Sequence, residues 1–490
     1  MFWRGVLGYL PVQVVQGLVG FGSVYVFTRL LTAEQYGQYA LALSAAALLH
    51  AGFITWMEAS MERFHIGEAQ RGEAPSHLTT LHRAFLLLGF SSLVVTAVAL
   101  GVLPLDPALE NAIAGAVVAS TLRSGLRLVQ QRRKAEGQVA VYALNDILVT
   151  AGGFALGVAM THAGFGALAP FLGTAGAAGL FLLLAIPREW RRSAGGRFEP
   201  ARARRYAAYG LPISLTLLLA VIYSSTDRFM IALFLDERSV GAYHAAFGLA
   251  DRTLDLLFIW IGLAGWPAAI AALERDGIPA MRKVATDQFE LLALVALPAA
   301  VGLAAVAGPL SEVMIGEALR GPAAAIIPWI TLCALFAGFK AYYFDQAFTL
   351  ARRPAIMLIP VGLAAVMNII LNILLIPRFG LEGAVVATTL SVGSAAAASC
   401  ALGRRVMPLP VPWGTLLRCA ACAGAMGVAV RSGPDLGGAP ELAVKIAIGV
   451  AVYALAALLV DAAHVRSRAL TLLPSRRRAA RLASPPSEAA

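Results

Sequence analysis

The sequence has few charged residues and few cysteines, and each shortage excludes a class of protein. Only 14% of the 490 residues are charged and 59% are hydrophobic, a balance that a soluble domain of this size does not have. The four cysteines, Cys333, Cys400, Cys419 and Cys422, lie in apolar segments, so no disulfide framework is predicted. Cys419 and Cys422 have C-x-x-C spacing, but they lie inside a predicted span, where small residues on a helix face are favoured over a redox or metal site with its polar context and exposed thiol.

Motifs that carry chemistry are also missing. The sequence has no G-x-x-x-x-G-K-[ST] phosphate-binding loop, so ATP is not expected to drive this chain directly. The seven histidines have no spacing typical of a metal site, and no catalytic constellation is visible. Alternating strands of about ten residues are absent, which argues against a membrane barrel. We therefore predict no enzyme, no metal and no cofactor, with a proton or sodium as a possible coupling ion.

What the sequence does contain is a series of apolar runs, each long enough to cross about 30 Å of hydrocarbon as a helix. The mean hydropathy is +0.74, and the predicted fold class is an all-α integral membrane protein. The run nearest Met1 has no small-residue cleavage site and is interpreted as a retained helix. We predict fourteen spans, at 5–29, 37–61, 83–104, 111–131, 138–160, 165–187, 207–234, 241–268, 287–310, 322–350, 355–376, 383–403, 413–430 and 443–462.

The lysines and arginines indicate which side of the membrane each loop faces. If both termini are cytoplasmic, the inner loops and tails hold 27 of the 39 lysines and arginines, and the outer loops hold 5. Because loops rich in these residues stay in the cytoplasm, the asymmetry supports an even number of spans with both termini inside. It also accounts for the net charge of +11 without a nucleic-acid partner, since anionic lipid attracts the same residues.

Two halves of the chain carry the same features at matching positions. Pro11 lies near the start of the first span and Pro212 near the start of the seventh. Further echoes pair Thr32–Ala40 with Asp236–His244, and Gly164–Ala167 with Gly380–Ala384. Broken helices at corresponding places of repeated halves point to a transporter, so both prolines are interpreted as helix breaks. We predict two pseudo-symmetric six-helix lobes around a central cavity, related by an axis along the membrane normal.

The predicted domains follow from this duplication. The N-terminal lobe covers residues 1–188 and the C-terminal lobe covers 207–405. A basic cytoplasmic linker at 189–206 joins them, and two additional helices occupy 406–463. The tail at 464–490 is rich in Arg, Ser and Pro and is expected to be disordered.

Several short segments, in order and at the expected spacing over residues 1–405, resemble one transporter family. They are Thr28–Leu41, Ser225–Leu235, Val240–Ala246 and Leu374–Ala384. The chain thus resembles the polysaccharide transporter family, the O-antigen-type flippases of the multidrug/oligosaccharidyl-lipid/polysaccharide exporter superfamily. The resemblance implies transport of a polyprenyl-diphosphate-linked oligosaccharide to the outer leaflet of a bacterial cytoplasmic membrane, for export of O-antigen, exopolysaccharide or capsule repeat units. The partners that it implies are membrane lipids and the polymerase and chain-length proteins of the same pathway.

Ionisable residues within spans are candidates for function, because each is costly in hydrocarbon unless it faces a cavity or a partner. Arg123 and Arg127 are four residues apart and share one helix face, where they match the charge of a diphosphate. The alternative for Arg127 is snorkelling to the headgroups. Arg252 and Lys340 are further candidates for substrate contact. Arg252 could instead pair with Asp255, and Lys340 could snorkel.

Three acidic residues are candidates for gating or ion coupling. Asp146 lies deep in its span, where it could balance an arginine of a neighbouring helix or carry a proton. Asp227 lies in the outer third of the seventh span, where the family resemblance suggests a structural or gating role. Glu58 lies at the inner end of the second span, where a gate pair with Arg63 is the simplest interpretation.

Three other functions remain open. A lipid II flippase of the same superfamily also has fourteen helices. A cation-coupled multidrug exporter usually has twelve helices and an acidic cavity, which Arg123 and Arg127 argue against. A membrane enzyme of glycan assembly belongs to a different class and typically carries a large outer loop, whereas the outer loops predicted here are short.

Overall fold

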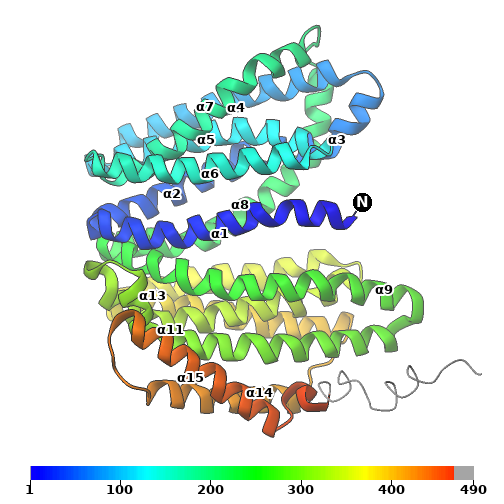
Figure 1. The fold of residues 1–490 in the computed structure, drawn as a ribbon. Helices are drawn as coiled ribbons and strands as arrows, with labels where there is room; N and C mark the ends of the chain where they lie inside the picture. Colours follow the sequence, from blue (N-terminus) through cyan, green and yellow to red (C-terminus); the bar gives the residue numbers. More distant parts are fainter. Residues whose placement is uncertain (1, 468–490) are drawn as a thin grey trace, which may run out of the picture. The chain divides into compact units, whose positions relative to one another are not determined.

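The computed structural model describes residues 2–467, with side chains described from Pro11 onwards. All regular secondary structure in this part of the chain is helical, which confirms the predicted all-α membrane fold (Figure 1). Eleven of the described helices are long and apolar enough to cross a membrane, and twelve if the bent pair α2 and α3 counts as one span. The count of fourteen spans stays a prediction.

The helix boundaries follow the predicted spans. The first eight helices are α1 (Phe2–Leu30), α2 (Ala33–Phe53), α3 (Thr55–Gln70), α4 (Ala74–Val102), α5 (Pro107–Ala135), α6 (Val139–His162), α7 (Ala169–Ser193) and α8 (Pro200–Phe234). They are followed by α9 (Glu237–Ala305), α10 (Ala307–Met314), α11 (Glu317–Phe339), α12 (Gln346–Leu350), α13 (Leu358–Val406), α14 (Trp413–Arg431) and α15 (Gly438–Leu459). Short 3-10 turns lie at Gly166–Leu168, Pro354–Met357 and Ala462–His464, and a π-turn lies at Lys340–Phe344.

Helices α9 and α13 are each interrupted at one glycine. Gly277 has a φ of 77° and Gly380 a φ of 58°, values that glycine adopts without the steric cost of a side chain. A straight helix with the 69 residues of α9 would be about 100 Å long at 1.5 Å per residue, about three times the hydrocarbon thickness. The two glycines therefore divide segments that the sequence predicts as pairs of spans.

Both prolines that predicted helix breaks lie inside helices. Helix α1 continues through Pro11 and α8 continues through Pro212, so neither helix ends there, and a kink at either proline stays a prediction. An internal proline is tolerated in a membrane helix because its surroundings can satisfy the freed backbone group. The break that does occur was not predicted, since α2 and α3 meet at an angle of 47° at Ile54, inside the predicted span 37–61.

The segment predicted as a basic linker, 189–206, is largely helical. Helix α7 extends to Ser193 and α8 begins at Pro200, so only residues 194–199 connect them. The predicted tail at 464–490 falls mostly outside the described residues.

The chain divides into two compact units. The first comprises residues 1–249, 314–323 and 369–384, and the second comprises 250–313, 324–368 and 385–490. The first unit includes α8, which the predicted lobe boundaries assign to the C-terminal lobe; those boundaries stay a prediction.

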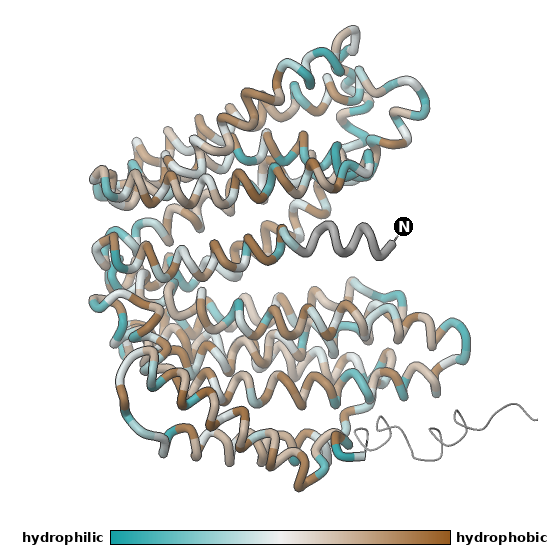
Figure 2. Tube along the Cα trace, in the orientation of Figure 1, coloured by the Kyte–Doolittle hydropathy of each residue, from teal (hydrophilic) through white to brown (hydrophobic). Residues whose placement is uncertain are grey.

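Within the first unit, α4 to α7 run side by side, with hydrophobic residues along the helices and hydrophilic residues gathered towards their ends (Figure 2). Helices α6 and α7 approach each other very closely. A Cβ atom added to Gly173 would lie 2.2 Å from the backbone nitrogen of Gly157, so only glycine allows these two backbones to touch.

Candidate functional site

A group of polar side chains connects α2, α3 and α5 inside the first unit. His50 lies one turn before the bend between α2 and α3, and Glu58 lies one turn after it. The His50 Nε2 atom is 3.7 Å from Glu58 Oε2 and 3.3 Å from Arg127 Nη1. His50 Nδ1 is 2.9 Å from the Ser124 hydroxyl. The bend therefore brings a carboxylate and an imidazole to the arginine-bearing face of α5.

The hydrogen-bond partners assign the proton positions in this group. The Ser124 hydroxyl donates to the backbone carbonyl of Ser120, so it is free to accept a hydrogen bond from His50 Nδ1–H. Arg127 can only donate, so His50 Nε2 accepts from it. This arrangement requires a neutral imidazole with its proton on Nδ1, an assignment inferred from the network.

Arg123 lies one turn from Arg127, on the same face of α5. Its Nη2 atom donates to the Thr150 hydroxyl of α6 at 3.3 Å, and Asp146, one turn earlier on α6, is among its electrostatic neighbours. Asp146 is buried and accepts a hydrogen bond from Gln16 of α1 at 2.7 Å. Of the two roles predicted for Asp146, these contacts fit the balancing of an arginine across helices.

Both arginines are half-buried, and their hydrogen bonds go to neutral acceptors. Glu58 is 9% exposed, and its Oε1 atom is buried without a hydrogen-bond partner in the described part of the chain. A buried carboxylate oxygen that lacks a donor is costly. This network of His50, Glu58, Arg123 and Arg127, with Asp146 beside it, is the candidate site, and below it is called the α5 network.

The other predicted site residue of the first unit, Asp227, joins three helices. Its carboxylate accepts hydrogen bonds from the Tyr243 hydroxyl of α9 and from Asn372 Nδ2 of α13, both at 2.7 Å. Asp227 is 3% exposed. These contacts give Asp227 a role in holding α8, α9 and α13 together.

In the second unit, Lys340 opens the π-turn and pairs with Asp345 at 2.7 Å. Asp345 also accepts a hydrogen bond from Ser399 of α13 at 2.8 Å. Arg252 is exposed, and its expected partner Asp255 accepts a hydrogen bond from another residue, the Tyr342 hydroxyl. The structure thus brings Arg123, Arg127, Glu58 and Asp146 together, whereas Arg252 and Lys340 lie in another unit.

A different set of arginines, at the end of the bundle predicted to be cytoplasmic, pairs with carboxylates. Arg132 of α5 bonds Glu189 of α7 through Nε at 3.2 Å and Nη2 at 2.6 Å, and bonds Glu136 through Nη1 at 2.7 Å. Arg202 of α8 pairs with Glu68 of α3. Burial alone would raise the pKa of Glu136, but hydrogen bonds from Arg132 and His65 outweigh it and hold that pKa below its usual range.

Sequence reasoning missed His50, because a single histidine in an apolar run carries no spacing signal. It also used Arg132 and Arg202 only as inner-loop charges that indicate membrane orientation, whereas both form buried ion pairs. A usable signal was the separation of Glu58 and His50 by eight residues on the same predicted span, about two helical turns. This spacing places them near one face, although it does not predict the bend.

The chemistry of the α5 network is anion binding rather than bond making. Two guanidinium groups stacked on one helix face repel each other, and an anion with two phosphates offers each of them charge-assisted hydrogen bonds. His50 lies between the other two groups, with its Nε2 atom 3.7 Å from Glu58 Oε2 and 3.3 Å from Arg127 Nη1.

Comparison with known proteins supports a family and a fold. A family model described as "Polysaccharide biosynthesis protein" matches residues 26–321, more than half of the chain, and confirms the family that the sequence segments resemble. No curated protein matches the chain.

Solved structures share its fold at low identity. The structure titled "Lipid II flippase MurJ, inward closed conformation" has a TM-score of 0.71 and 13% identity, covering 93% of this chain and 98% of that one. An inward-facing multidrug resistance MATE family transporter of the MOP superfamily has a TM-score of 0.59 and 15% identity, covering 80% and 94%. An outward-facing MATE transporter has a TM-score of 0.51 and 14% identity, covering 81% and 93%. The chain therefore belongs to the polysaccharide biosynthesis protein family and has the fold of MurJ and the MATE transporters.

Proposed function

We propose that this protein is a flippase that moves a polyprenyl-diphosphate-linked oligosaccharide from the cytoplasmic to the outer leaflet of a bacterial cytoplasmic membrane. It works by alternating access, with both termini in the cytoplasm, and supplies repeat units for O-antigen, exopolysaccharide or capsule. The polymerase and chain-length proteins of that pathway are its expected partners. The family, the fold shared with a lipid II flippase and the charge of the α5 network support this proposal.

The observation that carries the proposal is the identity of the hydrogen-bond acceptors of Arg123 and Arg127. Their hydrogen bonds go to Thr150 and His50, which are neutral, so each guanidinium keeps capacity for a charged ligand. A diphosphate that leaves the headgroup layer loses its hydration, and fixed guanidinium donors replace part of it through charge-assisted hydrogen bonds. A structural arginine is expected to pair with a carboxylate instead.

The bend between α2 and α3 suggests how binding is linked to movement. A diphosphate that draws Arg127 away leaves His50 Nε2 free to bond a protonated Glu58, whose Oε1 has no partner among the described residues. We propose Glu58 as the coupling group, taking up a proton during the cycle. Asp146 and Asp227 are then structural, since both carboxylates are held by amide or hydroxyl donors.

The test measures transport of a defined lipid. Purified protein in proteoliposomes receives a fluorescent undecaprenyl-diphosphate oligosaccharide, and movement is followed by quenching from the outside. Lipid II and a cationic dye serve as the substrates of the two alternative functions. We expect Arg123→Ala to lower movement of the oligosaccharide lipid at least about tenfold and Arg123→Lys to restore part of it, since a point charge lacks the bidentate geometry of arginine.

The matched control is Arg418→Ala. Arg418 is another arginine inside a predicted span, in α14 of the second unit, and it is exposed, so its loss is expected to leave transport unchanged. Transport of lipid II alone, or of the dye alone, would replace the proposed substrate by that of the alternative. Normal transport by Arg123→Ala would remove the α5 network from the substrate path.

A further inference from the structure

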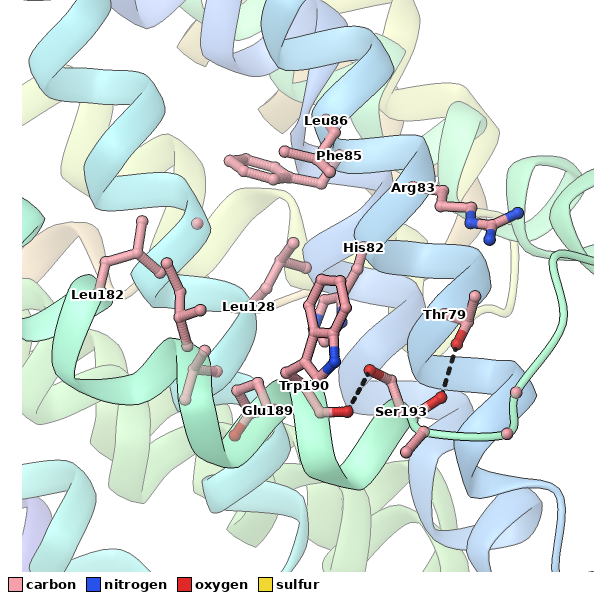
Figure 3. Close-up of a pocket in the computed structure, with 16 residues that line it drawn as sticks. Thr79, His82, Arg83, Phe85, Leu86, Leu128, Leu182, Glu189, Trp190 and Ser193 are labelled. Atoms are coloured by element: carbon pink, nitrogen blue, oxygen red, sulfur yellow. Dashed lines mark hydrogen bonds between the residues drawn. The ribbon is translucent and has the colours of Figure 1, made fainter.

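A lateral cavity of about 690 Å³ lies between α4, α5 and α7, outside the α5 network. Its walls are largely apolar and include Phe85, Leu86, Leu128, Leu182, Ile186 and Trp190. Polar groups gather at one end, where Thr79, Glu189 and Ser193 lie around Trp190, while Phe85 and Leu86 lie at the other (Figure 3). The cavity is therefore amphipathic along its length.

The polar end is closed by a fixed turn. Thr79 donates to the Ser193 carbonyl at 3.2 Å, and the Ser193 hydroxyl donates to the Trp190 carbonyl at 3.0 Å. A Cβ atom on Gly196 would lie 2.2 Å from the Pro75 carbonyl, so the turn after α7 presses directly on the start of α4. The turn gives the cavity a rigid polar floor.

A second groove of about 470 Å³ lies on the adjoining face of α4. It is lined by Trp56, Leu87, Leu88 and Phe198, and it contains Arg204 of α8. Arg83 lines both hollows, and its guanidinium points away from Trp190, towards the outside of α4 (Figure 3). Two apolar hollows therefore flank one helix, with an arginine at their boundary.

The surface around both hollows is the kind that faces lipid. Large apolar side chains on α4 and α7 are more than 60% exposed, namely Leu86, Leu87, Phe90, Leu183 and Leu184. Trp190 is 76% exposed at the polar end, and tryptophan is typical of the membrane–water boundary. Acyl chains of the bilayer can enter these hollows without crossing water.

We propose that the two hollows bind one anionic diacyl phospholipid of the cytoplasmic leaflet. One acyl chain occupies the larger cavity and the other lies in the groove on the adjoining face of α4, while the phosphate contacts Arg83 and Arg204. Both arginines are exposed, and no carboxylate is hydrogen-bonded to either in the described part of the chain, so an anionic headgroup supplies the missing charge. The lipid is a bound component of the protein and is distinct from the transported one.

A two-chain lipid fits the geometry better than the long single chain of a polyprenyl carrier, because the apolar space is divided by α4 instead of continuous. Glu189 is the one carboxylate among the described residues that line this cavity, and it is paired with Arg132, so it does not repel the phosphate as an isolated charge would.

The test uses photoreactive phosphatidylglycerol, with a diazirine in one acyl chain, in nanodiscs containing the full-length protein. We expect labelling of peptides from α4 and α7. Ile186→Trp fills the larger cavity and should remove most of this labelling, whereas Leu184→Trp, at an exposed position that does not line it, should not. Arg83→Gln should lower labelling by about fivefold, the effect of one arginine near a charged headgroup.

Three results would overturn the proposal. Equal labelling by photoreactive phosphatidylcholine would show that the site does not distinguish an anionic headgroup from a zwitterionic one. An equal loss in Arg188→Gln, an exposed arginine outside both hollows, would reduce the effect to general attraction of basic residues for anionic lipid. Displacement of the probe by undecaprenyl diphosphate would assign the hollows to a transported lipid. Because Arg83 is exposed, the Arg83→Gln arm decides the question even if Ile186→Trp fails to fold.

Discussion

Arg132→Ala and Arg123→Ala remove the same side chain from the same helix, and we predict opposite consequences. Arg132 is 3% exposed in its side chain, and Glu189, which it binds through two nitrogen atoms, is 8% exposed. Removing one partner of a buried ion pair costs about 3–5 kcal/mol, because the other charge stays buried without a partner. Glu189 borders the lateral cavity, where water can reach it after the substitution, so we expect the lower end, about 3 kcal/mol.

Arg123 makes a much weaker contribution to the fold. Its hydrogen bond to Thr150 is 3.3 Å long and joins a half-buried side chain to a hydroxyl. A bond of this kind contributes about 0.5–1.5 kcal/mol, and the Thr150 hydroxyl, which only accepts in it, keeps its own proton to donate elsewhere. We therefore expect Arg123→Ala to keep nearly wild-type stability while transport falls. A lost charge-assisted hydrogen bond of about 1.5–3 kcal/mol corresponds to a reduction of roughly 10-fold to 150-fold.

The assay measures both quantities on each variant. Stability comes from the denaturant midpoint of the purified protein in detergent, and transport from glycan export in cells normalised to membrane protein level. The double variant Arg132→Met with Glu189→Leu should regain most of the lost stability, because an apolar pair of similar volume replaces the ion pair. The reasoning is refuted if both single alanine variants lose stability equally, or if Arg132→Ala is as stable as wild type.

Three further outcomes are expected. Gly173→Ala should lower the thermal midpoint, because its Cβ atom would lie 2.2 Å from a backbone nitrogen of α6, whereas Gly176→Ala, with its nearest neighbour 3.7 Å away, should not. The low pKa of Glu136 contributes stability above about pH 4.3, the unfolded value, which is lost as the pH falls further; Glu136→Gln should flatten this slope in acid-denaturation curves. Cysteines placed at Arg197 and Ser432 should react with an impermeant reagent from opposite sides, and equal labelling would contradict the predicted topology.

The sequence predicts the fold well because membrane helices leave a strong signal. A run of about twenty apolar residues has few alternatives in hydrocarbon, and most predicted spans overlap a helix of the structure closely. The errors concern backbone geometry inside spans. Proline suggested breaks in α1 and α8, yet both helices continue through it, while the bend at Ile54, two residues after Gly52, was not predicted because glycine is frequent throughout the spans. Such a bend depends on packing between helices, which a single sequence does not display.

The candidate site was predicted in part. The free-energy cost of an ionisable side chain in hydrocarbon identified Arg123, Arg127, Glu58 and Asp146 as candidates, and the structure places all four in one unit. The same criterion could not find His50, since a neutral histidine is inexpensive in a span. It also could not name the partners of Asp146 and Asp227, because these lie on other helices.

The partners of each arginine, more than its position, divide the arginines of this protein into two groups. Arg132 and Arg202 bind carboxylates at the ends of the helices. These ion pairs neutralise their charge, so an incoming anion would have to break one of them. Arg123 and Arg127 lie deeper and bond to a hydroxyl and an imidazole, and although Asp146 and Glu58 lie near them, neither arginine forms an ion pair in the described part of the chain. Holding two such charges in hydrocarbon is unfavourable at rest, and a passing diphosphate relieves that cost. Substituting Thr150→Asp would give Arg123 a permanent carboxylate partner; we expect a more stable protein that transports poorly, and unchanged transport would refute the idea that an uncancelled charge is what the substrate needs.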